Sequence, residues 1–429
     1  SLLMSLARLA LNISASRVPW LGGKSLRADR RTGTGRKRCT KVSAEMKTVP
    51  MHVGFVGTGL IGKVTVAQMA GRAPQLRDEG LDIRITGATD SKSMIVANGA
   101  DGMSLSRVEQ AIGDRVSDWD AASVNATISD VDLDAFVNAL QRAAKDSGGA
   151  AVVVDNTSSD AVASLYQDWL KRGVHVVTPN KKANSGDLTR FELTKQAALD
   201  GNAKWLYEGT IGAGLPIVST LRTLRASGDE IRVVQGIFSG TMSFLFNVWD
   251  PTKPFSDVVF QAKQAGYTEP DPRDDLNGLD VARKVVIAAR EAGLDLSLHD
   301  VDVASLVPAE LEDCSVEDYL TRLPEFDSVI ARQAMEADAE GKVLRFVGKV
   351  DVMAKTGTVE LAKFPKDHPF ATLQGADNIV EIQSMRYSAE MESTPLIIRG
   401  PGAGAQVTAG GVFGDVCKLG VMLGARVPL

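Results

Sequence analysis

Cysteine is scarce in this sequence. Among 429 residues only Cys39, Cys314 and Cys417 occur, far apart and without a C-x-x-C pair. Disulfide frameworks and structural zinc sites need paired or clustered cysteines, so neither is expected to organise this fold. A reducing compartment is the natural setting for such a chain.

Long apolar runs and a basic body are missing as well. No apolar run approaches the roughly 20 residues that a membrane-spanning helix needs, so we expect no membrane partner. The residues after position 48 hold 37 Lys+Arg against 51 Asp+Glu. This acidic body argues against nucleic acid as a partner, because phosphate binding requires a basic face.

The first 48 residues have the opposite charge balance. They contain 11 Lys+Arg but only Asp29 and Glu45 as acids. A basic, serine-containing, acid-poor start is typical of an organelle transit peptide, and we expect targeting to the plastid. The alternatives are a mitochondrial or cytoplasmic location, with residues 1–48 as a basic tail that has no targeting role.

Residues 49–186 show strands alternating with helices. The strands are expected at Met51–Gly57, Ile83–Thr89, Ala151–Val154 and Val174–Thr178, and the helices at Ile61–Ala70 and Ala161–Lys171. This alternation predicts an α/β fold with a Rossmann-type, doubly wound parallel sheet. The length also exceeds that of a single hydrophobic core, so a second lobe is expected.

Residues 187–399 differ in pattern and predict an α+β lobe with a mixed sheet. Its helices are expected at Phe191–Leu199, Pro216–Ala226, Ser256–Ala265 and Leu276–Ala292, and its strands at Arg232–Phe238, Val343–Val352, Gly357–Lys363 and Asn378–Gln383. We assign this lobe to catalysis and dimerisation. Residues 400–429, with a helical pattern from about Gln406 to Leu423, are expected to complete the dinucleotide-binding domain of 49–186.

A glycine-rich turn follows the first expected strand. Gly57, Gly59 and Gly62, with Leu60 and Ile61 between them, form a G-x-G-x-x-G run that leads into a helix. The glycines allow a tight turn and close approach of a pyrophosphate, and the helix N-terminus offers free N–H groups. Such turns also occur without a ligand, but this order of strand, turn and helix favours a dinucleotide site.

The end of the second strand bears on the choice of dinucleotide. Asp90 could accept hydrogen bonds from a ribose 2′-hydroxyl, which favours NAD. Ser91 and Lys92 follow at once and could hold the 2′-phosphate of NADP. Asp90 could also simply cap a turn. The preference between NAD and NADP stays open.

Two more strand ends carry polar residues. Thr157 lies in the run Asp155-Asn-Thr-Ser-Ser, and Lys181 lies in Thr178-Pro-Asn-Lys-Lys. Ligands of open α/β sheets collect at the carboxyl edge of the strands, so both runs are candidates for the site. A solvated surface lysine is the alternative for Lys181.

The segment Gly266–Lys284 is the most informative one. Glu269, Asp275 and Asp280 are among the acids that precede or share the expected helix of Lys284. Asp280 and Lys284 are four residues apart and so share one helix face. An exposed ion pair is the simple explanation, but the helix continues as an apolar, buried-looking run. Carboxylates around one lysine suit a small cationic amine substrate that undergoes proton transfer.

This segment resembles the homoserine dehydrogenase signature at every specified position, from Ala262 to Lys284. Other runs agree in order, including Tyr207-Glu-Gly-Thr-Ile-Gly-Ala-Gly-Leu-Pro and Gly400-Pro-Gly-Ala-Gly. The resemblance covers about Met51 to Leu423 and is nearest to the homoserine dehydrogenase part of bifunctional aspartokinases. It implies NAD(P)-dependent interconversion of L-homoserine and L-aspartate 4-semialdehyde, on the route to threonine, methionine and isoleucine.

The resemblance also implies roles for residues. Lys284 and Lys181 correspond to the catalytic lysines, with Lys181 also near the nicotinamide, and Glu269, Asp280 and Asp275 to the substrate-binding acids. Thr157, Gly266 and Gly404 correspond to cofactor contacts. A monovalent cation, usually sodium, would be bound largely through the backbone carbonyls of four residues: Glu208, Ile211, Ala213 and Leu215. A homodimer is usual in the family.

A lysine whose pKa is lowered by burial and by a neighbouring lysine could transfer a proton near neutral pH, although the nearby acids oppose that lowering. From the resemblance we expect a monofunctional chain, without an aspartokinase or an amino-acid-sensing ACT domain.

Two other hypotheses for the function are another Rossmann-type amino-acid dehydrogenase and a non-catalytic NAD(P)-sensing module. A semialdehyde dehydrogenase needs a cysteine nucleophile in a suitable context, and a sensing module has no use for the acid–lysine segment.

Overall fold

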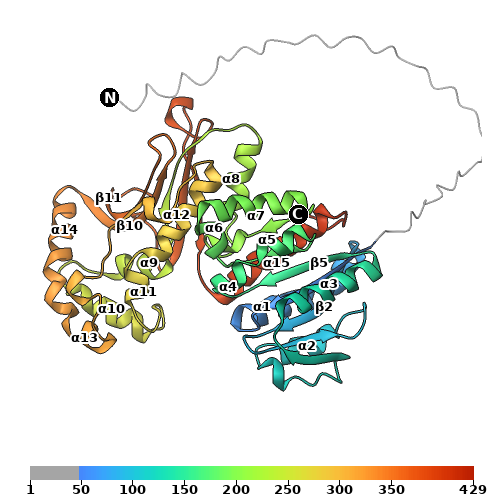
Figure 1. The fold of residues 1–429 in the computed structure, drawn as a ribbon. Coiled ribbons are helices and arrows are strands. Elements are labelled where there is room, and N and C mark those ends of the chain that lie inside the picture. The colour runs from blue at the N-terminus through green and yellow to red at the C-terminus, as the bar shows by residue number, and fades with distance from the viewer. Residues whose placement is uncertain (1–47) are drawn as a thin grey trace, which may run out of the picture. The chain divides into compact units, whose positions relative to one another are not determined.

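The computed structural model describes residues 48–429, which contain two β-sheets and their covering helices (Figure 1). The leader predicted at residues 1–48 therefore lies outside the described residues, apart from its last one. Within the described part, no helix has both the length and the apolarity needed to cross a membrane.

The first sheet has seven strands in the order β4-β3-β2-β1-β5-β6-β7. Its strands are β1 (Val49–Val56), β2 (Leu81–Thr89), β3 (Ser93–Ala97), β4 (Ala126–Asp130), β5 (Ala150–Asp155), β6 (His175–Val177) and β7 (Trp205–Leu206). The five strands from β2 to β7 are parallel, which confirms the predicted doubly wound sheet. The antiparallel edge formed by β3 and β4 is an addition that the sequence analysis did not predict.

Helices cover both faces of this sheet. They are α1 (Leu60–Asp78), α2 (Leu105–Ala111), α3 (Leu133–Ser147), α4 (Asp160–Ala163), α5 (Tyr166–Lys171), α6 (Lys182–Ser185), α7 (Leu188–Asp200) and α15 (Ala405–Met422), with the 3-10 turn η1 (Val116–Asp118). One core joins α1 and α15 to alternate residues of β1 and β5. The opposite face belongs to the core that includes α3, α5 and α7. The C-terminal helix thus returns to the first sheet and packs beside α1.

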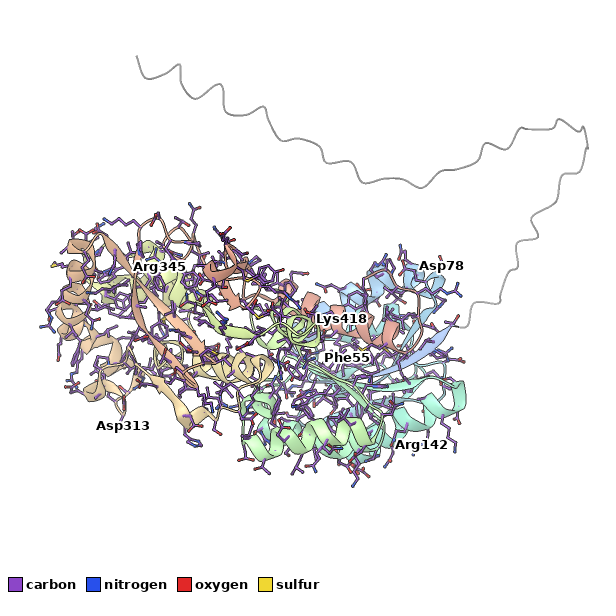
Figure 2. The ribbon with its side chains drawn as sticks, turned by 90° about the horizontal axis from the view of Figure 1, so that it is seen from above. Phe55, Asp78, Arg142, Asp313, Arg345 and Lys418 are labelled. Carbon is purple, nitrogen blue, oxygen red and sulfur yellow. The ribbon has the colours of Figure 1, made fainter. Side chains whose placement is uncertain are left out.

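Glycines let α3 approach the first sheet closely. A Cβ atom built at Gly54 of β1 would lie 2.7 Å from the ring of Phe136, and one at Gly87 of β2 would lie 2.5 Å from it. Real Cβ atoms do not come so near, so the aromatic ring of α3 fits here only because both strands carry glycine. Figure 2 shows how side chains fill the interior, with Phe55 inside and Asp78 and Arg142 at the surface.

The second sheet has six strands in the order β13-β12-β8-β10-β11-β9. Its strands are β8 (Ile231–Ile237), β9 (Val301–Val303), β10 (Lys342–Asp351), β11 (Thr356–Pro365), β12 (Asp377–Ser384) and β13 (Leu396–Pro401). All neighbouring pairs are antiparallel except β9 with β11, so the mixed sheet is confirmed. The helices here are α8 (Ile217–Ala226), α9 (Gly240–Val248), α10 (Phe255–Gln264), α11 (Arg273–Leu276), α12 (Leu279–Ala292), α13 (Val316–Arg322) and α14 (Asp327–Ala339). Short 3-10 turns are η2 (Glu208–Thr210), η3 (Leu298–Asp300), η4 (Ala309–Leu311), η5 (Leu323–Phe326) and η6 (Ala389–Met391).

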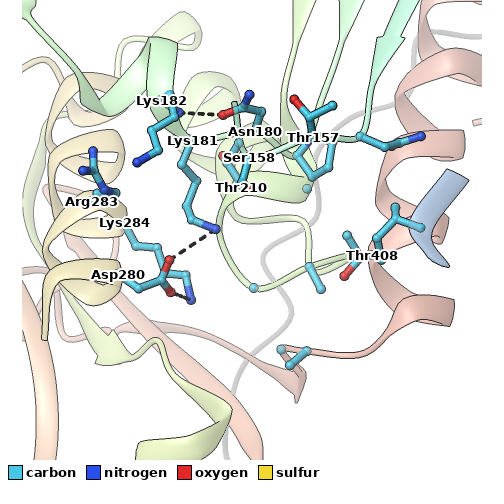
Figure 3. A pocket seen from close by; sticks show the side chains of 18 of the residues that line it. Thr157, Ser158, Asn180, Lys181, Lys182, Thr210, Asp280, Arg283, Lys284 and Thr408 are labelled. Carbon is cyan, nitrogen blue, oxygen red and sulfur yellow. Dashed lines mark hydrogen bonds and ion pairs between the residues drawn. The ribbon is translucent and has the colours of Figure 1, made fainter. Parts of the chain in front are cut away.

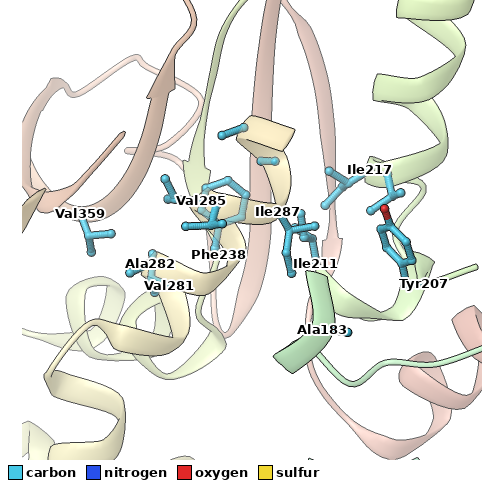
Figure 4. Packing of buried hydrophobic residues seen from close by; sticks show 14 of the residues in the cluster. Ala183, Tyr207, Ile211, Ile217, Phe238, Val281, Ala282, Val285, Ile287 and Val359 are labelled. Carbon is cyan, nitrogen blue, oxygen red and sulfur yellow. The ribbon is translucent and has the colours of Figure 1, made fainter. Parts of the chain in front are cut away.

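Helix α12 lies on the second sheet and is held mainly by packing (Figure 4). Val285 is fully buried, and Cβ atoms built at Gly348 and Gly357 would lie 2.6 and 3.1 Å from its methyl groups. Burying a side chain of this size contributes roughly 1.5–3 kcal/mol. The packing of Val285 and its neighbours therefore holds α12 against the sheet.

Some boundaries differ from the prediction. Helix α12 begins at Leu279 and not at Leu276, because Gly278 adopts φ +75° and separates it from α11. Helix α1 continues through Pro74 to Asp78, since Leu76 packs in the core behind it. The first sheet extends past residue 186 to β7, and the second sheet extends past residue 399 to Pro401.

Candidate active site

A cavity of about 550 Å³ lies at the carboxyl ends of β5 and β6 and reaches α12 (Figure 3). Its walls come from six separate segments of the chain. The lining residues are Ile61, Asn156, Thr157, Ser158, Pro179, Asn180, Lys181, Lys182, Gly209, Thr210, Gly212, Ala213, Asp280, Arg283, Lys284, Gly402, Ala403, Gly404 and Thr408. The structure thus brings Ile61, Thr157, Lys181, Asp280, Lys284, Ala213 and Gly404, all predicted site residues, to one place.

The predicted glycine turn joins β1 to α1 at the edge of this cavity. Gly57 has φ +90°, a conformation that favours glycine, and a Cβ atom at Gly62 would lie 2.6 Å from the Gly57 carbonyl oxygen. Around Gly59 there is open space within 4 Å, and Leu60 is 68% exposed. The turn therefore leaves backbone and the first N–H groups of α1 accessible, as a cradle for an anionic phosphate requires.

The Asp90 carboxylate is hydrogen-bonded to three backbone N–H groups. Its carboxylate accepts the N–H groups of Lys92, Ser93 and Val116 at 2.8, 2.9 and 2.9 Å. Burial alone would raise the pKa of Asp90, but these hydrogen bonds outweigh it and lower the pKa below its ordinary value. Since a carboxylate offers about four lone-pair sites, room for one more donor remains, while Lys92 is exposed beside it.

The two candidate lysines meet on a single carboxylate. Lys284 Nζ lies 2.8 Å from Asp280 Oδ2, and Lys181 Nζ lies 3.3 Å from Asp280 Oδ1 (Figure 3). Lys284 Nζ also donates to the Phe238 carbonyl oxygen at 2.7 Å. Burial alone would raise the pKa of Asp280, but the two ammonium groups outweigh it and hold the pKa well below its usual range. Asp280 is therefore an anion that spaces and orients both lysines.

Glu269 and Asp275, the other two predicted substrate-binding acids, do not line this cavity. Asp275 Oδ2 accepts the N–H of Glu269 at 2.8 Å, and Asp275 Oδ1 lies 3.0 Å from Thr241 Oγ1. Burial raises the pKa of Asp275, and the charges of Asp280 and Asp274 add to the rise. Asp275 thus shapes the loop that carries Glu269, whose side chain is exposed, as is Gly266 with φ +75°.

The segment Glu208–Leu215 packs tightly against α15. The Glu208 carboxylate is buried and accepts the Ser219 N–H at 3.1 Å and the Lys418 ammonium at 3.0 Å. Ala213 has φ +56°, which is uncommon for a residue with a side chain. A Cβ atom at Gly411 of α15 would lie 2.7 Å from the Ala213 carbonyl oxygen. The loop and the helix therefore form one closely packed wall of the cavity.

Several lining residues were not singled out from the sequence. Lys182 and Arg283 each follow or precede a predicted lysine, and they add two positive charges to those of Lys181 and Lys284. Asn156 and Asn180 flank predicted positions in the same strand-end runs, and both polar atoms of the Asn156 amide are buried without a hydrogen-bond partner. Proximity to strong motifs was the available signal. The resulting excess of positive charge suits phosphate and carboxylate groups.

Comparisons with known proteins agree with this geometry. Residues 57–208 match the family model described as "Homoserine dehydrogenase, NAD binding domain", and residues 216–417 match the one described as "Homoserine dehydrogenase". The homoserine dehydrogenase of Schizosaccharomyces pombe is 43% identical over 377 residues, which cover 86% of this chain and 95% of the relative.

A second relative and a solved structure extend the comparison. The chloroplastic bifunctional aspartokinase/homoserine dehydrogenase 1 of Zea mays is 47% identical over 377 residues, which cover 87% of this chain but 39% of that protein's length. A crystal structure of a Candida auris protein of unknown function superposes with a TM-score of 0.76 at 36% identity, covering 86% of this chain and 98% of the other. Since both family models and a relative of nearly equal length match it, this chain belongs to the homoserine dehydrogenase family.

Proposed function

We propose that this chain catalyses the NAD(P)-dependent interconversion of L-homoserine and L-aspartate 4-semialdehyde, a step towards threonine, methionine and isoleucine. One observation carries the proposal: the Lys181–Asp280–Lys284 arrangement lies in the same cavity as the end of the glycine turn. A proton-transferring group beside a dinucleotide site is the minimal equipment for oxidising an alcohol or reducing an aldehyde.

The cofactor fits the residues that are present. The cradle of Gly57, Gly59 and Gly62 is open at Gly59, and the unpartnered Asn156 amide lies beside Gly62. When bound there, the nicotinamide supplies or accepts the hydride. Thr157, Gly404 and the N-terminal turn of α1 would hold the dinucleotide, and the exposed Lys92 would contact the 2′-phosphate if the cofactor is NADP. We propose Asp90, Leu60, Ile61 and Gly266 as further cofactor contacts.

Lys284 is proposed to handle the proton. Its ammonium has three N–H donors, of which Asp280 and the Phe238 carbonyl oxygen engage two. The third is free to donate to the substrate oxygen during aldehyde reduction, and the neutral amine accepts that proton in the reverse direction. Lys181 holds the same oxygen or the substrate carboxylate from the opposite side of Asp280. Glu269 and Asp275 are proposed to face the substrate ammonium together with Asp280.

Substitution of Lys284 tests this assignment. Lys284→Met keeps the length of the side chain but removes the amine, so homoserine oxidation with NAD(P)+ should fall by about 10²–10⁴-fold. Lys342→Met is the matched control, because Lys342 pairs with Glu340 away from the cavity and should keep wild-type rates. Unchanged turnover in the Lys284 variant would contradict the catalytic role. A wild-type protein that binds NAD(P)H but leaves homoserine unreacted would contradict the proposed activity.

We further propose a monovalent cation, sodium by resemblance, at the backbone carbonyls of Glu208, Ile211, Ala213 and Leu215. The left-handed turn at Gly212 and Ala213 supports this, since such backbone is tolerated where function requires it. Lys418 already neutralises the Glu208 carboxylate, which leaves carbonyl oxygens as the donors. Exchange of sodium for choline should lower the thermal midpoint if the cation is bound.

Domain roles, assembly and location are also proposals. We assign the first sheet with α15 to dinucleotide binding, and the second sheet with α8 to catalysis and dimerisation. The edge strand β13, with Ile397 40% exposed, offers an unpaired surface for a homodimer, which light scattering would reveal.

Plastid targeting by residues 1–48 is supported by their composition and by the chloroplastic maize relative. A fluorescent protein fused to these residues would report it.

A further inference from the structure

Asp155 is a buried acid at the carboxyl end of β5, directly beneath the cavity. Its exposed fraction is 0%, and no lysine, arginine or histidine of the described residues forms an ion pair with it. A buried carboxylate without a countercharge is costly unless hydrogen bonds satisfy it. The hydrogen bonds of Asp155 therefore indicate why this position carries an acid.

One oxygen of this carboxylate is hydrogen-bonded to the loop that follows β5, where we propose that the cofactor binds. Asp155 Oδ1 accepts the backbone N–H of Thr157 at 2.8 Å. The Thr157 hydroxyl in turn accepts the N–H of Ser159 at 3.2 Å, which closes the loop after β5. Thr157 and Ser158 both line the cavity. Asp155 Oδ1 is thus one of the groups that fix this loop, together with the Val56 carbonyl oxygen, which accepts the Asn156 N–H at 2.8 Å.

The other oxygen is hydrogen-bonded to the loop that follows β6 and carries Lys181. Asp155 Oδ2 accepts the Asn180 side-chain N–H at 3.0 Å and the Tyr166 hydroxyl. The Thr178 hydroxyl donates to the Asp155 carbonyl oxygen at 2.7 Å and accepts the Asn180 backbone N–H at 2.8 Å. Lys181 follows directly after Asn180. The loop that presents this lysine is therefore fastened to the same residue as the cofactor loop.

Only a carboxylate fits this set of partners. Every group that points at the two oxygens is a donor: a backbone N–H, an amide N–H and a phenol O–H. An asparagine offers one acceptor oxygen and one NH₂ group, so in either orientation its NH₂ would face a donor. Burial raises the pKa of Asp155 and of Tyr166, and the hydrogen bonds to Asp155 act against the rise in its own pKa.

We propose that Asp155 is a positioning residue that places Thr157 and Lys181 relative to each other, so that cofactor binding and the lysine pair depend on one buried carboxylate. This inference rests on the proposed function for its kinetic readout. Its binding and exchange readouts do not depend on which alcohol is the substrate.

The test compares three variants of the full chain. Asp155→Asn should weaken NADPH binding at least fivefold, measured by fluorescence titration, and lower kcat for homoserine at least tenfold. Amide hydrogen exchange should speed up in both 157–159 and 180–182. Tyr166→Phe removes a hydroxyl that is hydrogen-bonded to Asp155 Oδ2 and Thr178 but to no residue of 157–159, so kcat should fall at least fivefold while the NADPH Kd stays within twofold of wild type. Thr86→Val, which removes the buried hydrogen bond to His52 in the same sheet, should lower the thermal midpoint but leave Kd and kcat unchanged.

The outcomes separate the possibilities. If Asp155→Asn lowers kcat but binds NADPH like wild type, or changes only the thermal midpoint as Thr86→Val does, the positioning role is wrong. Should Asp155→Asn fail to fold, wild-type kcat in Tyr166→Phe would overturn the proposal by itself. If the wild-type protein does not turn over homoserine, the proposed activity is refuted. If Asp155→Asn nevertheless shows the expected changes in NADPH binding and amide exchange, the positioning role still holds.

Discussion

At the residue scale, the main feature of the site is that four positively charged side chains and a single carboxylate line the cavity. Lys181, Lys182, Arg283 and Lys284 surround the cavity, and Asp280 is the sole acid among its lining residues. Two of the four cations contact that carboxylate directly. Asp280 consequently offsets the repulsion between the two ammonium groups that lie on either side of it.

Removal of that charge is expected to disturb both lysines at once. Asp280→Asn keeps the size of the side chain but leaves the ammonium groups without a counterion, so kcat for homoserine oxidation should fall by about 10–100-fold. Asp280→Glu should recover part of the loss. Asp274→Asn is the control, since Asp274 is exposed in the same segment and does not line the cavity. Equal rates in the Asp280 and Asp274 variants would refute the bridging role.

Sequence reasoning identified Lys181, Asp280 and Lys284 but neither Lys182 and Arg283 nor the arrangement of these charges. The i,i+4 spacing predicts that Asp280 and Lys284 share a helix face, and the structure has them 2.8 Å apart. The contact between Lys181 and Asp280 joins residues about a hundred positions apart, so no local pattern could reveal it. The role of Asp280 as a bridge between lysines, beside its proposed contact with the substrate, emerges only from that contact.

At the scale of elements, the β1–α1 turn carries the cofactor prediction. Its glycines are needed for different reasons: Gly57 adopts a positive φ, and Gly62 allows the helix to approach the Gly57 carbonyl. Helix α1 also contains Gly71, where a Cβ atom would meet nothing within 4 Å. The same helix therefore offers a sensitive glycine and a neutral one.

Alanine at these two positions should give opposite results. Gly62→Ala brings a methyl group 2.6 Å from a backbone oxygen, which forces the turn to shift and should weaken NADPH binding at least tenfold. Gly71→Ala should leave binding unchanged and stabilise the protein by about 0.5–1 kcal/mol, because alanine is the better helix former. Fluorescence titration and thermal unfolding measure the two effects. Similar NADPH affinities in both variants would contradict the cradle.

Buried strands bounded by turns were predicted well, whereas short exposed strands and one amphipathic helix were not. The buried strands β1, β2, β5 and β6 follow from apolar runs bounded by turns. The antiparallel strands β3 and β4 are short, and β4 is largely exposed, so they lack that signal. Helix α3 was missed although Asp132 caps its start, with the carboxylate accepting the Ala135 N–H at 2.9 Å, and Gly148 ends it.

At the scale of the whole molecule, two buried histidines make stability depend on pH. His52 of β1 is 0% exposed and hydrogen-bonded to Thr86 and Ser147, and His175 of β6 is 5% exposed. Burial lowers the pKa of each to about 4, with Arg84 adding to the effect at His52 and Lys204 at His175. Between pH 6.5 and 4 the unfolded chain therefore binds more protons than the folded one.

The sign of the dependence follows from that difference. Stability should be full above about pH 6.5 and should decrease as the pH falls towards 4, by up to about 3 kcal/mol for each histidine. Chemical unfolding at pH 7, 5.5 and 4.5 measures this slope. His52→Asn cannot take up the proton, so its stability, although lower at pH 7, should decrease less over the same range. An identical slope in that variant would show that His52 does not contribute.

The sequence by itself determined the local parts of this protein: the glycine turn after β1, the helix that places Lys284 one turn after Asp280, and the alternation of buried strands and helices. These follow from spacing and backbone conformation, which act over a few residues. Only the tertiary structure decided that Lys181 shares Asp280 with Lys284, that α1 is the helix against which α15 packs, and that Asp155 is hydrogen-bonded to two loops. Each of these depends on burial and hydrogen bonding between segments that the fold brings together, and such contacts leave no periodic trace in the chain.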